Sequence, residues 1–355
     1  MHLHRALFVV LALAVAAPGS AQSTSARERE RQRVEREREK AQETRDRALE
    51  REQERRAREQ EQRDQGDERH DRDRERRARD AAGSLDTAVA FDAHGTVLVS
   101  CPGGTILVTA AERSEVRVRA RTGTGAIRFT SSGGRATLEP ASGRGCSDGR
   151  FELTVPAGSR VTATTWSGSV GVHGVQGEIE IHAQSGDVDV RDAGDRLDIE
   201  TLSGDVTVQT VKGYLTVRTV SGDLQLRGAR GDVEIETVSG DLDLHDISSK
   251  QVRTHSTSGN ILFAGQVLDA GRYEFDTHSG EVRLHLPPDA GAQLSVSTYS
   301  GSVESDFPII LKPGEHGIGG VQSRRLTFTL GRGSARILAE TFSGDIILSS
   351  TAPRR

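Results

Sequence analysis

Aromatic side chains and methionine are scarce in this sequence. Aromatic residues make up 4% of its 355 residues, with one Trp and one Met, whereas Gly occurs 39 times. Few bulky side chains and many glycines favour a fold with many tight turns and small or β-branched packing residues. The composition therefore argues against a conventional enzyme core.

Long apolar runs are missing as well. The apolar run near the start, residues 6–17, follows the basic segment Met1–Arg5 and precedes small residues before Gln22. It is too short to span a bilayer and is typical of a secretory signal peptide. We expect residues 1–21 to be removed, and the mature protein to be exported, as a periplasmic, envelope-associated or secreted chain without a membrane span.

Cysteine is limited to Cys101 and Cys146. In the oxidising compartment expected for an exported chain, an even pair favours a disulfide over a metal site. Two thiolates alone rarely hold zinc. We therefore predict a Cys101–Cys146 disulfide, and the sequence indicates no cofactor.

An excess of positive charge is also absent. Residues 27–80 hold 20 Lys/Arg and 19 Asp/Glu, whereas residues 81–355 hold 26 and 33, a net charge of −7. Binding to nucleic acid needs a net basic face. We therefore expect no nucleic-acid partner.

A charged, low-complexity arm at residues 22–84 lacks the apolar content of a core. Its composition gives either a solvated helix or a disordered segment. Val34, Ala41 and Ala48 lie seven residues apart and hint at a coiled-coil seam, although one Val and two Ala make a poor seam. We interpret the arm as a spacer or an electrostatic tether.

A repeat occupies the rest of the sequence. Ser-Gly pairs recur every 18 residues and then after 19, 21, 21 and 43 residues, and we expect the last interval to hold about two coils. The pairs begin at Ser167, Ser185, Ser203, Ser221, Ser239, Ser258, Ser279, Ser300 and Ser343. Apolar and polar residues alternate between them, as in Val206-Thr207-Val208-Gln209. The pattern predicts an all-β, single-domain β-solenoid over residues 85–350, whose coils bury their inward side chains by stacking.

Two further expectations concern the solenoid and its ends. Thr201, Thr210, Thr219 and Thr237 should form an inward column that bonds along the stack. The less regular residues 84–156 should begin the same stack and cap it. Residues 351–355 form a short tail.

The order of motifs along this region resembles the bacterial putative-adhesin family of β-strand-repeat domains of unknown function. The motifs are Phe151–Gly158, the Ser-Gly-Asp repeats, Leu284-His285-Leu286-Pro287, Gly331-Arg332-Gly333 and Thr341–Ile346. The resemblance covers about residues 85–350. It implies an exported β-solenoid with no established catalytic residues, and it does not extend to the charged arm.

Aspartates follow four consecutive Ser-Gly pairs and are the weak candidates for a metal site. They are Asp187, Asp205, Asp223 and Asp241. Stacked about one strand spacing apart, their carboxylates repel, so something must offset the repulsion. We favour backbone N–H groups in each aspartate's own turn and keep a ladder of cations as the alternative. The Gly-Gly-x-Gly-x-Asp motif of calcium β-rolls is absent.

An enzyme on this scaffold needs two carboxylates at reaction distance in a groove. The outward candidates are Glu180, Asp198, Glu200, Glu234 and Glu236. Asp198 should lie near Glu180 on neighbouring coils, but Thr216 and Arg218 separate these two from the last pair. We interpret all five as solvated charges on a strand face and predict no catalytic residue.

A column of mostly apolar residues lies directly before the Ser-Gly pairs. It consists of Trp166, Leu202, Val220, Val238, His278, Tyr299 and Phe342. If alternation continues, these side chains point outward and suit a glycan, a partner protein or self-association. We favour the other possibility, in which the chain kinks at the corner and these side chains point inward.

The sequence therefore predicts a non-catalytic, adhesin-like binding or structural module of the cell envelope, with a glycan or protein as partner. One alternative is a self-assembling scaffold that polymerises through exposed strand edges at the solenoid ends. The other is a polysaccharide-degrading β-helix enzyme.

Overall fold

The computed structural model describes residues 83–350 except 124, 142–147 and 309–323, together with the isolated helical residues Arg55 and Gln60. The chain divides into two units, residues 1–74 and 75–355. The predicted signal peptide, most of the charged arm and the tail lie outside the described residues. Cys101 is buried on the second strand, but Cys146 also lies outside them, so the disulfide stays a prediction.

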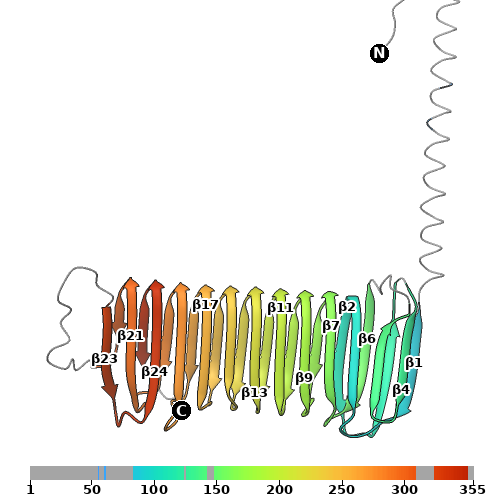
Figure 1. The fold of residues 1–355 in the computed structure, drawn as a ribbon, viewed down its shortest axis with the longest axis horizontal. Helices are drawn as coiled ribbons and strands as arrows, with labels where there is room; N and C mark the ends of the chain where they lie inside the picture. Colours follow the sequence, from blue (N-terminus) through green and yellow to red (C-terminus); the bar gives the residue numbers. More distant parts are fainter. Residues whose placement is uncertain are drawn as a thin grey trace, which may run out of the picture. The chain divides into compact units, whose positions relative to one another are not determined.

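The described part of the second unit contains 25 strands, arranged as Figure 1 shows. They are β1 (Ser84–Ala90), β2 (Thr96–Ala111), β3 (Glu115–Arg121), β4 (Ile127–Ser132), β5 (Arg135–Pro140), β6 (Gly149–Pro156), β7 (Arg160–Ser167), β8 (Val170–His173), β9 (Glu178–Ser185), β10 (Val188–Ala193), β11 (Arg196–Ser203), β12 (Val206–Val211), β13 (Tyr214–Ser221), β14 (Leu224–Ala229), β15 (Val233–Ser239), β16 (Leu242–Ile247), β17 (Gln251–Ser258), β18 (Ile261–Gly265), β19 (Arg272–Ser279), β20 (Val282–Leu286), β21 (Ala292–Ser300), β22 (Val303–Ser305), β23 (Arg324–Leu330), β24 (Ala335–Ser343) and β25 (Ile346–Ser350). Among the described residues, no helix is both long and apolar enough to cross a membrane.

Each coil of the chain contributes one strand to each of two parallel ladders. Ladder A contains β8, β10, β12, β14, β16, β18 and β20, and ladder B contains β7, β9, β11, β13, β15, β17 and β19. Leu197 of β11 pairs in register with Ile179 of β9 and Leu215 of β13. The ladders share one core, in which the ring centroids of Phe263 on β18 and Phe275 on β19 are 5.0 Å apart. The predicted β-solenoid is confirmed.

At the N-terminal end, a strand from early in the chain lies inside the stack. The first half of β2 pairs with β5 and β7 in ladder B, and its second half pairs with β6 and β8 in ladder A. Thr96 is thus opposite Arg160, 64 residues further along the chain. The strands β1, β3 and β4 extend this end with antiparallel pairings.

The C-terminal end contains the same kind of insertion. β24 lies between β19 and β21 in ladder B, and β25 lies between β20 and β22 in ladder A. The expectation of two successive coils between Ser300 and Ser343 is wrong, because Ser343 pairs with both Ser279 and Ser300. After β22 the chain forms β23, which is antiparallel to β21, and then returns into the stack.

The inward position of the predicted threonine column is confirmed except at one residue. The predicted hydrogen bonds along the stack are wrong for Thr201, Thr219 and Thr237, whose hydroxyls donate within their own coil. Thr201, Thr219 and Thr237 are buried and in register on ladder B. Thr210 lies instead on β12 of ladder A, is exposed, and has a φ of 61°. The residues with positive φ at the equivalent place in other coils are Gly174, Asp192, Gly228 and Asp246. A left-handed residue therefore recurs near the end of the ladder A strands, and Thr210 is the β-branched one.

Candidate binding surface

The Ser-Gly-Asp corner determines how each coil meets the one before it. Gly222 has a φ of +121°, and a Cβ atom there would lie 2.2 Å from the carbonyl oxygen of Gly204, so the turn and the close stacking both require glycine. Ser221 Oγ donates a hydrogen bond to the carbonyl oxygen of Leu202, 3.3 Å away in the preceding coil. Close backbone packing and a side-chain hydrogen bond therefore connect this corner to the one in the preceding coil.

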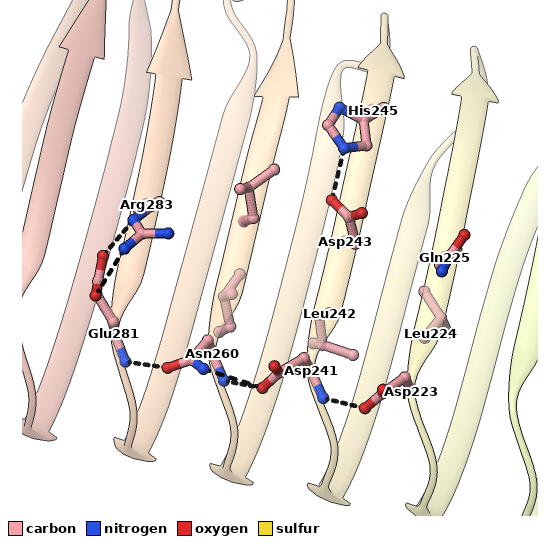
Figure 2. Close-up of a pocket in the computed structure, with 12 residues that line it drawn as sticks. Asp223, Leu224, Gln225, Asp241, Leu242, Asp243, His245, Asn260, Glu281 and Arg283 are labelled. Atoms are coloured by element: carbon pink, nitrogen blue, oxygen red, sulfur yellow. Dashed lines mark hydrogen bonds and ion pairs between the residues drawn. The ribbon is translucent and has the colours of Figure 1, made fainter.

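The four aspartates that were the weak metal candidates form a hydrogen-bonded series along the corners. Figure 2 shows its last two members, Asp223 and Asp241. Oδ1 atoms of Asp187, Asp205 and Asp223 accept the backbone N–H of the aspartate in the next coil, at 3.2, 3.0 and 2.9 Å. Asp241 bonds to Asn260 in the same way, at 2.9 Å. The expected amide donors are present, but they come from the following coil rather than from each aspartate's own turn.

This series gives no sign of a cation site. Within the described ranges, no group of three or more His, Cys, Asp or Glu side chains is arranged to hold a metal ion. At the inserted C-terminal coil, the backbone N–H and the hydroxyl of Ser302 both bond to Asp345 Oδ1, at 2.7 and 2.9 Å, and lower the pKa of that carboxyl group. The corner carboxylates thus act as acceptors that join coils.

Backbone alternation after the buried threonines places the next side chain outside. The Oγ1 atoms of Thr201 and Thr219 each donate to the carbonyl oxygen two residues later, at 3.3 Å, which holds the threonine inward. Leu202 and Val220 follow these threonines and are 50% and 46% exposed. The outward alternative for the apolar column is therefore the observed one.

We call this column the apolar ridge. Its members in spatial order are Trp166, Leu202, Val220, Val238, His278, Phe342 and Tyr299. Among the described residues, the exposed large hydrophobic side chains all belong to the ridge except Leu338. The exposure is thus concentrated in one line along ladder B.

Polar residues divide the ridge into parts. Gln184 and Thr257 occupy the ridge position in two intermediate coils, so Trp166 stands apart from an aliphatic part and an aromatic part. The aliphatic part is Leu202, Val220 and Val238, and the aromatic part is His278, Phe342 and Tyr299.

The aromatic part is a continuous stack. The ring centroids of His278 and Phe342 are 4.8 Å apart with an interplanar angle of 10°, and those of Phe342 and Tyr299 are 4.7 Å apart at 7°. These distances match the spacing of strands in a sheet. Phe342 lies in the middle because β24 is inserted between β19 and β21, an order that the sequence does not reveal.

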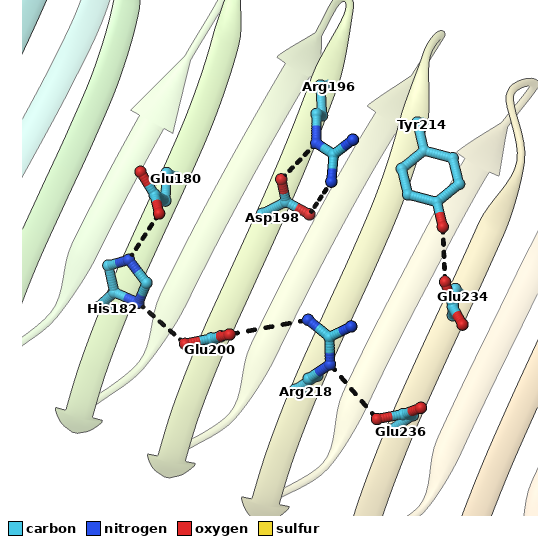
Figure 3. A network of polar contacts seen from close by, with 9 residues as sticks. All are labelled: Glu180, His182, Arg196, Asp198, Glu200, Tyr214, Arg218, Glu234 and Glu236. Carbon is cyan, nitrogen blue, oxygen red and sulfur yellow. Dashed lines mark hydrogen bonds and ion pairs between the residues drawn. The ribbon is translucent and has the colours of Figure 1, made fainter.

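A shallow groove of about 440 Å³ runs beside the aliphatic part. Leu202 and Val220 line one side, and His182, Glu200 and Arg218 line the other. These three residues form a row across neighbouring coils: His182 Nδ1 is 3.2 Å from Glu200, and Arg218 is 3.7 Å from Glu200 and 3.4 Å from Glu236 (Figure 3). The groove therefore joins an apolar edge to a row of alternating charge.

The carboxylates considered for catalysis have basic or hydroxyl partners in this network. Asp198 lies opposite Glu180 as expected, but it bonds to Arg196 at 2.6 Å, and Glu180 bonds to His182 at 3.0 Å. Glu234 accepts a hydrogen bond from the Tyr214 hydroxyl at 2.6 Å, which raises the pKa of Tyr214. These carboxylates lie on the outer face of a sheet and have polar partners there, and their interpretation as solvated charges stays a prediction.

Residues 106–244 and 148–349 match the Toastrack DUF4097 family. The chain is similar to a "putative adhesin" from Bacteroides fragilis NCTC 9343, with 12% identity over 75% of this chain and 96% of that chain and a TM-score of 0.36. It is also similar to a "putative cell adhesion protein" from Clostridium sporogenes ATCC 15579 (9% identity, 76% and 100% covered, TM-score 0.24) and a "putative lipid binding protein" from Parabacteroides distasonis ATCC 8503 (9%, 76% and 97%, 0.33). No curated protein matches.

Proposed function

The chain belongs to the Toastrack DUF4097 family, and from this premise we propose that it is a non-catalytic binding module of the cell envelope that holds its partner along the apolar ridge. The observation that carries the proposal is the ridge itself. Soluble proteins rarely expose contiguous apolar surface unless it is used for binding. Here the exposed apolar side chains lie in a line instead of being scattered.

The form of the ridge favours an extended partner. Its side chains project from consecutive coils of a rigid stack, and the groove adds the charges of Glu200 and Arg218 along one side. An apolar edge beside regularly spaced polar groups suits an extended glycan or polypeptide segment of the envelope. The export of the chain, which the proposal needs, rests on the signal peptide predicted for residues 1–21.

The two alternative functions stay hypotheses. Polymerisation through the ends needs open strand edges, and within the described ranges the end strands β1, β4 and β23 each pair with one neighbouring strand. A polysaccharide-degrading enzyme needs a carboxylate pair in a groove. The pair Glu180 and Asp198 instead forms hydrogen bonds with His182 and Arg196.

The test is co-sedimentation of the mature chain, residues 22–355, with isolated bacterial cell envelopes. We expect the variant that combines Trp166→Ala, Tyr299→Ala and Phe342→Ala to bind about tenfold or more weakly, because exposed aromatic anchors dominate binding energy. A second variant combines Leu202→Ser, Val220→Ser and Val238→Ser and probes the aliphatic part.

The matched control is Leu338→Ala, since Leu338 is exposed but lies outside the ridge. Unchanged thermal unfolding of each variant shows that the fold is intact. If both ridge variants sediment with envelopes as the control does, the ridge is not the binding surface. The same measurement on residues 81–355 shows whether the charged arm adds to binding.

A further inference from the structure

A groove at the N-terminal end of ladder A collects arginines from two paired strands. It has a volume of about 610 Å³ and is lined by Ser84, Leu85, Asp86, Arg119, Ala120, Arg121, Arg150 and Glu152. Arg119 and Arg121 come from β3, and Arg150 comes from β6. The groove lies on β1, β3 and β6, away from the ridge, which belongs to ladder B.

Two of these arginines face each other directly. Arg121 pairs with Arg150 in the antiparallel register of β3 and β6, and both side chains are exposed. Like charges directly opposite on antiparallel strands repel and destabilise the pairing. The repulsion between them is offset only as far as carboxylates nearby neutralise the two guanidinium groups.

The carboxylates nearby do not balance the arginines. Asp86 is shared by Arg117 at 3.2 Å and Arg119 at 3.6 Å. Glu152 bonds to Arg150 at 2.8 Å. Within the part of the chain that the structure describes, no carboxylate forms an ion pair with Arg121. Four guanidinium groups therefore meet two carboxylates, in a domain whose sequence is acidic overall.

The corner aspartates and Arg218 show two ways in which this fold offsets stacked charge. The corner aspartates, which also stack on one another, are offset by backbone N–H donors. Arg218 lies between Glu200 and Glu236. At this pair the chain supplies Glu152 to Arg150 but, among the described residues, no carboxylate to Arg121, so an anion from outside would complete the set.

We propose that this groove binds a phosphate group between Arg121 and Arg150, with Arg119 and the Ser84 hydroxyl at its edge. Ser84 lies opposite Arg121 on β1. The planar donors of arginine match the oxygens of phosphate in pairs, and several oxygens let one phosphate bridge two guanidinium groups. The groove has the volume of a small-molecule site. The phosphate comes either from a free or soluble phosphorylated compound or from a lipid headgroup.

Inorganic phosphate tests the site on the mature chain. We expect millimolar phosphate to raise the unfolding temperature relative to chloride at equal ionic strength, and the double variant Arg121→Gln/Arg150→Gln to lose this shift. In phosphate-free buffer of low ionic strength, Arg121→Gln should be at least as stable as the parent, because the substitution removes the repulsion. Binding followed by ³¹P NMR should be about tenfold or more weaker in the double variant.

The matched control is Arg227→Gln. Arg227 is an exposed arginine on β14 of the same ladder, and its register neighbours are Gln209 and His245 rather than arginine. This control should keep the phosphate shift. A shift of equal size in the parent, the control and the double variant, or no shift in the parent, overturns the proposal.

Vesicles separate the two sources of phosphate. If the source is a lipid headgroup, the parent protein sediments with phosphatidylcholine vesicles that contain phosphatidylglycerol but not with vesicles of phosphatidylcholine alone. The double variant then loses this binding. A phosphate shift without vesicle binding identifies a free or soluble phosphate compound. Vesicle binding that is unchanged in the double variant contradicts the lipid source. The ridge variants are expected to keep the phosphate shift, so failure of either proposal leaves the other intact.

Discussion

The middle of the solenoid and its two ends use the same ladders but different contacts along the chain. From β9 to β16, each strand pairs with the strand one coil before it, 18 residues away, as Val188 pairs with Val206. At the ends, β2 and the β24–β25 pair are inserted between strands that lie far from them in sequence. Arg272, for example, pairs with Arg336.

The difference shows what a repeat can and cannot specify. In the middle, corner glycines, serines and alternating strands determine one neighbour, because the next coil is also the next segment of chain. At the ends, several coils present the same alternating pattern, so the pattern does not specify which strands an inserted strand pairs with. The partners of β2, β24 and β25 come from segments that lie far from them in the sequence. Contacts of high sequence separation carry a larger loop-closure cost and slow folding.

The largest effect is expected when a corner in the middle is broken. Gly222→Ala places a Cβ atom against the carbonyl oxygen of Gly204 and forces alanine to a φ of +121°, so we expect a loss of about 3–5 kcal/mol in the free energy of unfolding. Gly133, in the turn of β4 and β5 at the N-terminal end, also has positive φ but nothing within 4 Å of a Cβ. Gly133→Ala should cost only about 1–2 kcal/mol. Equal losses in urea unfolding would mean that stacking does not constrain the corner.

A medium effect is expected next to the C-terminal insertion, where the coils lengthen. Tyr273 of β19 is buried, accepts a hydrogen bond from the Leu268 N–H at 2.8 Å and donates one to the Ser249 carbonyl oxygen at 2.9 Å. Tyr273→Phe leaves these groups unpaired and should cost about 1–3 kcal/mol. Tyr299→Phe is the control, because Tyr299 is exposed and should change stability by less than about 0.5 kcal/mol.

The same tyrosine gives a pH dependence. Burial raises the pKa of Tyr273 above the ordinary value of about 10. Its contribution is therefore fully present below about pH 10 and is lost as the pH rises through the folded-state pKa, because the unfolded chain releases the proton first. Urea unfolding from pH 9 upward should show a smaller decline for Tyr273→Phe than for the parent. Identical declines would place the alkaline sensitivity elsewhere.

The smallest change in stability is expected in the middle of the solenoid, at the one coil that departs from the pattern. Thr210 has a φ of 61°, and the equivalent residues in two other coils are glycines, Gly174 and Gly228. Thr210→Gly should therefore raise the unfolding free energy by about 0.5–1 kcal/mol, despite the entropy cost of glycine. Thr207→Gly on the same strand lacks this strain and should be destabilising by about 1 kcal/mol. A loss in both variants would show that Thr210 is not strained.

Much of the middle could be predicted from sequence, because its physical causes are local. The alternation of Val206 and Val208 with polar residues and the recurring glycines specify strands and corners within nine residues. The position of Phe342 could not be predicted, since it depends on β24 entering between β19 and β21. Thr210 was misplaced in the inward column because the shared spacing of threonines hides the switch from ladder B to ladder A.

The residues of the candidate site could be predicted from the sequence, but their arrangement in space could not. The position before each Ser-Gly pair identified the ridge residues, while the choice between outward and inward depended on whether the corner kinks. The prediction that backbone N–H groups bond to the corner aspartates was correct, but these groups come from the following coil and not from each aspartate's own turn. The pair Arg121 and Arg150 was not predicted. The two residues are neighbours only because β3 and β6 pair in antiparallel register, and those strands lie outside the repeat.

The insertion of β25 also affects how the molecule responds to mechanical tension. The strand is bonded on both sides, to β20 and to β22. A force that pulls on the C-terminus must therefore break two rows of backbone hydrogen bonds together, whereas an ordinary last coil would peel away from a single neighbour. A solenoid built in this way is protected against unravelling from that end.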